Sequence, residues 1–317
     1  MNDRASRIPI VLDVDTGIDD ALALLYAHFS PQLELVGVTT CFGNGGIEVT
    51  TRNTLAVLEL VGCRAPVYRG AAAPLTDTWA PGAEAFHGAN GLGGALIPDP
   101  IRVPETESAA PYLVRMADSR PGELTLVAVA RLTNVALALS LDPDFLTKIR
   151  RLVLMGGAAF VAGNVSATAE ANIWGDPEAA YKVFHAGGDV TMVGLDATHQ
   201  ARFHDTDLAG VDRAWPHAPL LTDALEFYLQ AYNPGAPKGT RSAPLHDPLA
   251  VMLAEAPDIA RYGHYPVDIE RTGLLTRGAT IVDTRPYSTS VPNAHVALGL
   301  DQERFRRLFL SRLGWPV

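Results

Sequence analysis

Short apolar segments alternate with helical segments along most of the chain, and this rhythm constrains the fold more than any other feature. Residues 8–14 (IPIVLDV) are rich in β-branched residues and are typical of a buried parallel strand. Asp19 and Asp20 then open the apolar stretch ALALLYAHF, and acids at this position favour a helix N-terminus. Repeated strand–helix units predict an α/β fold with a mostly parallel central sheet. Further strands are predicted at 33–40, near 67, and at 124–130, 151–157, 189–195, 264–270, 279–283 and 295–300, and further helices at 48–60, 109–118, 133–140, 176–186, 204–213, 218–231, from 246 onward, and at 301–313.

Two segments interrupt the rhythm. Residues 71–107 and 232–248 contain many Gly, Pro and Ala residues with little periodicity, and long irregular segments in a compact chain usually have a function. No linker, repeat or low-complexity run divides the sequence. We therefore expect one doubly wound, Rossmann-like domain over 1–317, with flexible loops at about 71–107 and 232–245. In such folds ligands bind beyond the carboxyl ends of the strands.

Charge and composition exclude several classes of partner. The 317 residues include 35 acidic residues against 25 Lys and Arg, a formal net charge of −10, which is unfavourable for nucleic acids and anionic membranes. The two cysteines are too few for a disulfide framework. No apolar run approaches the ~20 residues of a membrane helix, and the N-terminal segment is not a signal peptide. We expect a soluble, cytoplasmic protein.

Four carboxylates follow the first predicted strand, namely those of Asp13, Asp15, Asp19 and Asp20. Like charges this close must either be protonated or share a cation, and hard oxygen ligands favour Ca²⁺ or Mg²⁺. The alternative is that the last two acids only serve the helix N-terminus. An EF-hand is excluded, because Leu24 stands where that loop carries its glutamate.

Polar residues also follow the other predicted strands. Singly, such residues are more often turn formers or helix caps than ligands. As a set they lie at strand ends or in long loops, so they can converge on a metal ion and a polyhydroxylated ligand. The set comprises Asn44, Thr133, Asn134, Asn164, Glu170, Asn172, Asp176, His246 and Asp247. The sequence has no zinc-type Cys and His cluster, no phosphate-binding loop and no nucleophile elbow.

The segment IPIVLDVDTGIDDALAL resembles the N-terminal signature of the nucleoside hydrolases, the inosine–uridine preferring family. Further motifs resemble the same family in the same order: TTCFGN, FHGANGLGG, LTNVALAL, LVLMGGA, GNVSATAEANIWGDPEAA, PLHDPLAV, RGATIVDTRP and VALGLD. The resemblance covers essentially the whole chain from Ile8. It implies a calcium-dependent enzyme that hydrolyses the N-glycosidic bond of ribonucleosides, a small-molecule substrate, and a homodimer or homotetramer.

The resemblance also implies individual roles. Asp15 is the general base and a Ca²⁺ ligand, and Asp13 supports the site. The other implied Ca²⁺ ligands are Asp20, Asp247 and the backbone carbonyl of Thr133. His246 is implied to assist the leaving base, and its histidine identity argues against strict purine specificity. Substrate contacts are implied for Asp19, Asn44, His87, Asn164, Glu170 and Asn172.

The chemistry of the reaction agrees with this set. Cleavage of an N-glycosidic bond passes through an oxocarbenium-like ribosyl cation, which nearby carboxylates stabilise. Asp15 can take the proton of the attacking water. His246 is the natural donor to the leaving base, because an ordinary histidine has a pKa near neutrality.

Several positions depart from the family pattern or leave alternatives open. Thr16 and Arg131 stand where the family usually has Pro, and Arg131 could point away from the site or alter it. Tyr228, Tyr232 and Trp79 could contact the base, whereas Trp174 is expected to pack. The base preference itself stays open.

Two other functions compete. Asp13-Val14-Asp15-Thr16-Gly17 resembles the aspartyl motif of haloacid-dehalogenase-type phosphatases. That class needs a downstream lysine, and Lys148, Lys182 and Lys238 have no matching context. The other alternative is a catalytically silent ribose- or nucleoside-binding protein on the same fold.

Overall fold

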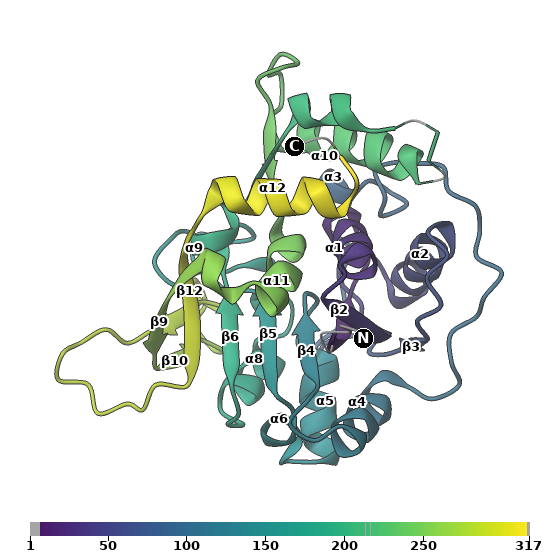
Figure 1. Ribbon diagram of the computed structural model, residues 1–317. Coiled ribbons are helices and arrows are strands. Elements are labelled where there is room, and N and C mark those ends of the chain that lie inside the picture. Colours follow the sequence, from purple (N-terminus) through teal and green to yellow (C-terminus); the bar gives the residue numbers. More distant parts are fainter. Residues whose placement is uncertain (1–6, 213, 216, 316–317) are drawn as a thin grey trace, which may run out of the picture.

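An eight-stranded sheet forms the centre of the computed structural model, which describes residues 7–212, 214–215 and 217–315 (Figure 1). All neighbouring strands are parallel except the pair β9 and β12 at one edge. The prediction of an α/β fold with a mostly parallel sheet is confirmed. The strand order is β3 (Val67–Arg69), β2 (Leu33–Thr40), β1 (Ile8–Val14), β4 (Thr125–Ala128), β5 (Arg151–Met155), β6 (Val190–Val193), β12 (Ala294–Leu300) and β9 (Ala260–Tyr265).

The order of the strands reverses between β1 and β4. From β1 the chain passes outward through β2 to β3, and it then returns to β4 and proceeds through β5 to β6 on the other side. In doubly wound sheets the two connections at this switch point run to opposite faces and leave a crevice beyond the carboxyl ends. The residues after β1 and β4 therefore border the expected ligand site.

The sequence of β1 accounts for its central position. Successive side chains of a strand point to opposite faces. Ile10, Leu12 and Val14 enter one hydrophobic core, whereas Val11 enters the other. Both faces are covered, so the strand is apolar without alternation, as its sequence indicates.

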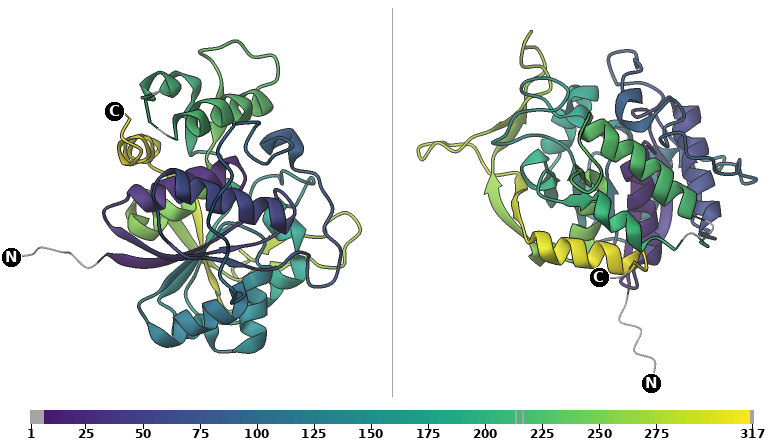
Figure 2. Two further views of the ribbon diagram at one scale, coloured as in Figure 1. Left: turned by 90° about the vertical axis from the view of Figure 1, so that its right-hand side faces the viewer. Right: turned by 90° about the horizontal axis from the view of Figure 1, so that it is seen from above.

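A helical layer covers each face of the sheet (Figure 2). The helices α1 (Ile18–Phe29), α2 (Ile47–Leu60), α11 (His246–Glu255) and α12 (Gln302–Arg312) share one core with the sheet. The opposite face carries α4 (Ala109–Ser119), α5 (Thr133–Leu141), α6 (Phe145–Lys148) and α8 (Pro177–Phe184).

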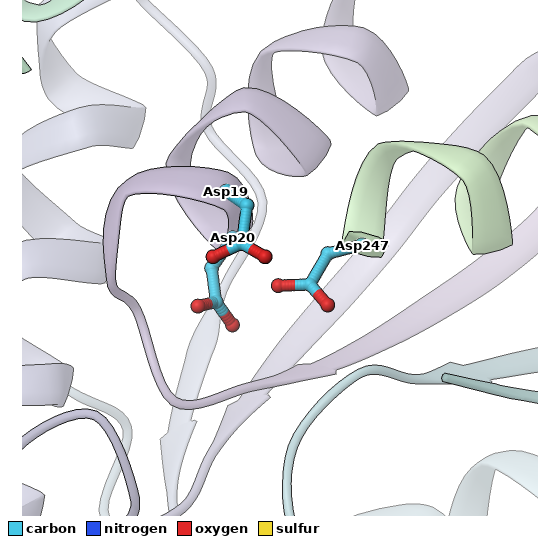
Figure 3. Close-up of side chains that lie close together, drawn as sticks. All are labelled: Asp19, Asp20 and Asp247. Carbon is cyan, nitrogen blue, oxygen red and sulfur yellow. The ribbon is translucent and has the colours of Figure 1, made fainter. Parts of the chain in front are cut away.

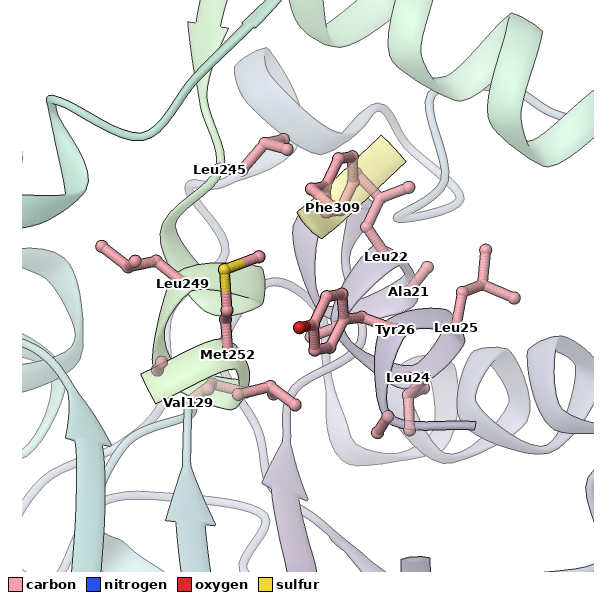
Figure 4. Close-up of a cluster of buried hydrophobic side chains, with 14 of the residues drawn as sticks. Ala21, Leu22, Leu24, Leu25, Tyr26, Val129, Leu245, Leu249, Met252 and Phe309 are labelled. Atoms are coloured by element: carbon pink, nitrogen blue, oxygen red, sulfur yellow. The ribbon is translucent and has the colours of Figure 1, made fainter. Parts of the chain in front are cut away.

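The contact between α1 and α11 positions the site. Tyr26 of α1 lies among Leu249 and Met252 of α11 and Phe309 of α12 (Figure 4). The Tyr26 hydroxyl also donates a 2.8 Å hydrogen bond to Glu255 at the end of α11. This packing fixes the two helices relative to each other, and hence the acids in their first turns.

Several elements differ from the sequence prediction. The predicted strand 264–270 is divided by Pro266, which cannot donate to a ladder, into β9 and β10 (Val267–Ile269), and β10 pairs with β11 (Thr280–Val282). The irregular segments contain α3 (Glu84–His87) and β8 (Ser242–Pro244), and β8 pairs with β7 (Arg202–His204).

The predicted helix 204–213 is a 3-10 helix over Asp205–Gly210, and its residue 213 lies outside the described residues. The predicted helix 218–231 comprises a π-helical turn, Leu220–Ala224, and α10 (Leu225–Tyr232). Three further short α-helices were not predicted, namely α6, α7 (Ala171–Gly175) and α9 (Leu195–Thr198).

No helix in the described part of the chain is both long enough and apolar enough to span a bilayer.

Candidate active site

A cavity of about 640 Å³ lies beyond the carboxyl ends of β1, β2, β4 and β5. This is the position that the strand-order rule predicts. All the side chains that the sequence suggested for catalysis or substrate contact line it. They are Asp15, Asp19, Asn44, His87, Asn164, Glu170, Asn172 and His246.

Three carboxylates from two helices converge beside this cavity (Figure 3). Asp19 and Asp20 lie in the first turn of α1, and Asp247 lies in the first turn of α11. One oxygen of each lies within 4.8 Å of those of the other two. All three residues are buried, and Oδ1 of Asp19 has no hydrogen-bond partner. The group has the hard oxygen donors that a divalent cation such as Ca²⁺ prefers.

The electrostatics of this group also favour a cation. Burial raises the pKa of Asp19 to about 7 and that of Asp20 to about 6, and neighbouring carboxylates add to both shifts. Burial, and then Asp19, raises the pKa of Asp247 as well. Removing several carboxylates from water costs free energy unless an opposite charge is supplied. The residues present therefore fit a divalent metal.

Asp15 follows β1 and is held from several sides. Its N–H donates to Oδ1 of Asp20 at 3.0 Å, and its Oδ2 accepts from the N–H of Asn44 at 2.8 Å. The same Oδ2 is ion-paired with Arg131. Burial raises the pKa of Asp15, the charge of Asp20 adds to the shift, and Arg131 opposes it. Arg131 therefore points into the cavity and alters it, which resolves the alternative that the sequence left open.

The amide and acid side chains of the opposite wall are fixed by backbone groups. Asn172 donates to the carbonyls of Val129 and Met155, at 2.8 and 3.0 Å, and so joins the ends of β4 and β5. Glu170 caps α7 and accepts from three backbone N–H groups. Asn164 accepts from the N–H of Ala171 at 3.0 Å. These partners hold the polar wall in place without a ligand.

Imidazole and phenol groups form the remaining wall. The Nε2 atom of His246 lies 3.1 Å from the hydroxyl of Tyr232, and its Nδ1 lies 2.8 Å from the hydroxyl of Thr198. His87 accepts from the N–H of Ile18 at 3.1 Å through Nδ1. Tyr228 packs edge-on against Tyr232.

Burial changes the expected protonation of these histidines. It lowers the pKa of His246 to about 3, with His199 as the next cause, and it lowers the pKa of His87 to about 3 as well. The sequence-based expectation of a near-neutral pKa for His246 is therefore wrong, because that value belongs to a solvated ring. At neutral pH the ring is neutral and carries a single N–H.

Three residues of the predicted set do not line the cavity. Asp20 belongs to the carboxylate group beside it. Thr133 begins α5, and its hydroxyl donates to Asp176 at 2.7 Å. Asp13 is fully buried, where it accepts hydrogen bonds from Thr39 at 2.5 Å and Asn134 at 2.7 Å. Val129, the first residue after β4, lines the cavity in place of Thr133. The strand-end rule could have identified Val129 had the end of that strand been placed correctly.

The two irregular segments contribute unequally to the lining of the cavity. Residues 77–83, Phe86 and His87, all from the first irregular segment, line the cavity, and Trp79 is among them. Residues 233–245 of the second segment do not line it. Trp174, which was expected to pack, is 49% exposed and lines the cavity. Tyr228 and Tyr232 also line it.

A doubly wound sheet with a buried carboxylate group and a polar cavity at its switch point is the arrangement of an α/β protein that binds a small ligand beyond its strand ends. The family model described as inosine-uridine preferring nucleoside hydrolase matches residues 10–307, and the chain belongs to that family. The expected enzyme class, a hydrolase that acts on N-glycosyl bonds, is confirmed by this membership.

Individual relatives cover nearly the whole chain. Uridine nucleosidase 1 of Arabidopsis thaliana is 39% identical over 276 residues, which are 86% of this chain and 81% of the relative. The pyrimidine-specific ribonucleoside hydrolase RihA of Salmonella paratyphi B is 37% identical over 96% of this chain and 98% of the relative. Among solved structures, the purine-preferring ribonucleoside hydrolase of Gardnerella vaginalis superposes with a TM-score of 0.90 at 37% identity, covering 96% of this chain and 98% of that one.

Proposed function

We propose that this nucleoside hydrolase is calcium-dependent and cleaves ribonucleosides, pyrimidine ribonucleosides among them, to free base and ribose. The observation that carries the proposal is the buried group of Asp19, Asp20 and Asp247 beside Asp15, at the switch point of the sheet. Uncompensated, these acids would destabilise the fold. With a divalent cation they form an anionic site that suits an oxocarbenium-like transition state.

The proposed metal ligands come from both sides of the crevice. Asp15, Asp20 and Asp247 would hold the ion through carboxylate oxygens. We place the backbone carbonyl of Val129, which lines the cavity, in the role expected for Thr133. That carbonyl accepts one hydrogen bond from Asn172, and its second lone pair is available. When bound, Ca²⁺ supplies the positive charge that keeps these acids ionised together, and it acidifies a water molecule.

Asp15 is the proposed general base. Its carboxylate lies in the cavity and is oriented by the N–H of Asn44, so it can take a proton from a water that attacks the ribosyl carbon. Asp13 lies behind the site and donates nothing to substrate; its backbone carbonyl accepts from the N–H of Val129. It supports the positions of β1 and the strand end after β4.

The remaining polar side chains bind the ribose. Asp19 has an unpartnered buried oxygen that can accept from a sugar hydroxyl or approach the metal. The other proposed ribose contacts are Asn44, Asn164, Glu170 and Asn172, all of which line the cavity. The hydrogen bonds that already hold these side chains lower the entropy cost of binding the sugar.

His246 assists the leaving base as a neutral hydrogen-bonding group. Its low pKa makes an imidazolium donor costly at neutral pH. The ring shares a hydrogen bond with Tyr232, and both groups line the cavity, so this pair can donate to a ring nitrogen or carbonyl of the base as negative charge develops there. His87 contacts the substrate from the first loop.

The named relatives support a pyrimidine substrate. Two of them are a uridine nucleosidase and a pyrimidine-specific hydrolase, whereas the Gardnerella vaginalis structure is of a purine-preferring enzyme. A hydrogen-bonding wall that contains His246 and Tyr232 can serve pyrimidines, whose carbonyl oxygens accept hydrogen bonds. The single domain over 1–317, the flexible loops and the homodimer or homotetramer remain predictions.

The alternatives have less support. A phosphatase of the haloacid-dehalogenase type needs a lysine at its site, and within the described part of the chain no lysine lines the cavity. A silent nucleoside-binding protein does not need a general base, yet Asp15 is present and oriented.

A reducing-sugar assay with uridine, cytidine and inosine tests the proposal. The protein is assayed after EDTA treatment, with and without added Ca²⁺, and free base is followed in parallel. We expect equal amounts of ribose and base, dependent on Ca²⁺ and faster with uridine than with inosine. Binding of uridine without any ribose would identify a silent binding protein.

A further inference from the structure

The side chain of Arg131 lies in a narrow space between Asp15, Asn172 and two glycines. It is ion-paired with Oδ2 of Asp15, and it donates to Oδ1 of Asn172 at 3.3 Å. Only 12% of the side chain is exposed. Its long stem therefore does not extend into solvent, as an arginine on the surface would.

The two glycines beside the Arg131 side chain are Gly43 and Gly175. A Cβ atom at Gly175 would lie 2.7 Å from Cγ of Arg131 and 2.8 Å from its Nε. A Cβ atom at Gly43 would collide with the guanidinium group itself. Any larger residue at either position would displace the arginine, so the inward orientation of Arg131 is built into its neighbours.

Arg131 also stands alone as a counter-charge. Among the described residues it is the one Lys or Arg ion-paired with the buried acids of the site, which are Asp13, Asp15, Asp19, Asp20, Glu170 and Asp247. The other arginine that lines the cavity, Arg277, forms two hydrogen bonds with Glu178, at 2.8 and 2.9 Å. Nδ1 of His87 lies 4.0 Å from Oδ1 of Asp19, and the two groups form an ion pair only when the imidazole is protonated.

We propose that Arg131 is an internal counter-ion of the acid group, a positioning residue that holds Asp15 in the metal-free protein and competes with Ca²⁺ for it. The proposal rests on the proposed function, in which Asp15 is a metal ligand. A guanidinium and a metal ion that share one carboxylate repel each other strongly in a buried site. Arg131 therefore weakens Ca²⁺ binding and at the same time stabilises the chain when the ion is absent.

Calorimetric titration of EDTA-treated protein with CaCl₂ tests the competition. Arg131→Met and Arg131→Gln remove the charge and keep much of the length, so that one serves if the other does not fold. We expect both to bind Ca²⁺ at least tenfold more tightly than the wild type, because the loss of a charge repulsion at such short range exceeds the value of a tenfold change even in a site of intermediate dielectric. Arg131→Lys retains the charge and should stay within about threefold of the wild type. Arg277→Met makes the same change elsewhere in the cavity and should stay within about twofold, because its partner lies outside the acid group.

Thermal unfolding in EDTA tests the counter-ion role without any metal. We expect Arg131→Met to unfold roughly 5 °C below the wild type, because a buried carboxylate loses its partner, and Arg277→Met to change less. Added Ca²⁺ should then raise the Tm of Arg131→Met more than that of the wild type.

The outcomes separate this inference from the proposed function. Ca²⁺ binding by the wild type with equal or weaker binding by both neutral variants would overturn the competition and leave the calcium site intact. No Ca²⁺ binding by any of the proteins would overturn the calcium site and the competition together. An unchanged Tm of metal-free Arg131→Met would overturn the counter-ion role.

Discussion

The cavity has two walls that differ in charge and in how they are held. The acidic wall consists of Asp15, Asp19 and Asp247, which line the cavity, and of Asp20, which lies beside it in the same carboxylate group. They come from the residues after β1, the first turn of α1 and the first turn of α11. The aromatic wall consists of His87, Tyr228, Tyr232 and His246, mostly from α3 and α10. The carboxylates of the acidic wall repel one another and need a cation. The side chains of the aromatic wall are neutral and are held by shared hydrogen bonds.

This difference separates two contributions to one reaction. In the proposed mechanism carboxylates act on the ribosyl cation, which is common to all substrates, so changes in the acidic wall should affect every nucleoside. In the same mechanism neutral hydrogen-bonding groups act on the leaving base, which differs between substrates. Changes in the aromatic wall should therefore depend on the base.

The largest effect is expected for Asp15→Asn in the acidic wall. The amide keeps the shape of the side chain but cannot take a proton, and it weakens a metal ligand, so kcat should fall by roughly 10³–10⁵. The loss should be similar for uridine and inosine. Steady-state kinetics measure it, and circular dichroism checks that the fold is retained. A near-normal kcat in a folded variant would remove Asp15 from the general-base role.

Metal removal should have the next largest effect and should also be common to all substrates. Treatment with EDTA should lower kcat/KM at least about 10²-fold, because the carboxylates lose the charge that keeps them ionised together, and Ca²⁺ should restore it. Dialysis against a series of divalent cations then identifies the ion that gives the most activity. Full activity in EDTA, with metal content below the protein concentration, would contradict a metal-dependent acidic wall.

In the aromatic wall, His246→Ala should discriminate between substrates. We expect kcat for uridine to fall by about 10–10²-fold, within the usual contribution of a hydrogen-bonding or acid–base group. Hydrolysis of p-nitrophenyl riboside should change little, since its leaving group needs no assistance. An equal loss with both substrates would place His246 in ribose binding or in the structure of α11.

The acidic wall could be predicted from the sequence much more completely than the aromatic wall. Asp15, Asp19 and Asp20 lie within one segment whose strand and helix have strong local signals, and the strand-end rule places them at the switch point. Asp247 comes from far along the chain, and only its place at the end of a long irregular loop and the family motif link it to the others. For Thr133 the motif points to a helix residue outside the cavity, and β4 ends two residues earlier than predicted, which leaves Val129 at the strand end.

The aromatic wall depends on packing that periodicity does not describe. Tyr228 and Tyr232 have the spacing of core residues on a helix, and only the placement of α10 over the cavity gives them access to it. The direction of Arg131 depends on the absence of side chains at Gly43 and Gly175, which are remote from it in sequence. The shift in the pKa of His246 arises from burial, a property of the assembled fold.

The smallest effect is expected for Tyr232→Phe, and it tests whether the aromatic wall acts as a unit. The change removes one hydroxyl 3.1 Å from His246, and a hydrogen bond with a net value of about 0.5–1.5 kcal/mol predicts a roughly 2–12-fold loss in kcat for uridine. If the hydroxyl acts through His246, the double variant with His246→Ala should be no slower than His246→Ala alone, since coupled groups are not additive. Tyr181→Phe, which removes a tyrosine hydroxyl outside the cavity, serves as the matched control and should not show this coupling to His246. Losses that multiply in the Tyr232 double variant would mean that Tyr232 contacts the base on its own. The aromatic wall would then be two independent contacts, unlike the acidic wall, whose members we propose to be coupled by one shared cation.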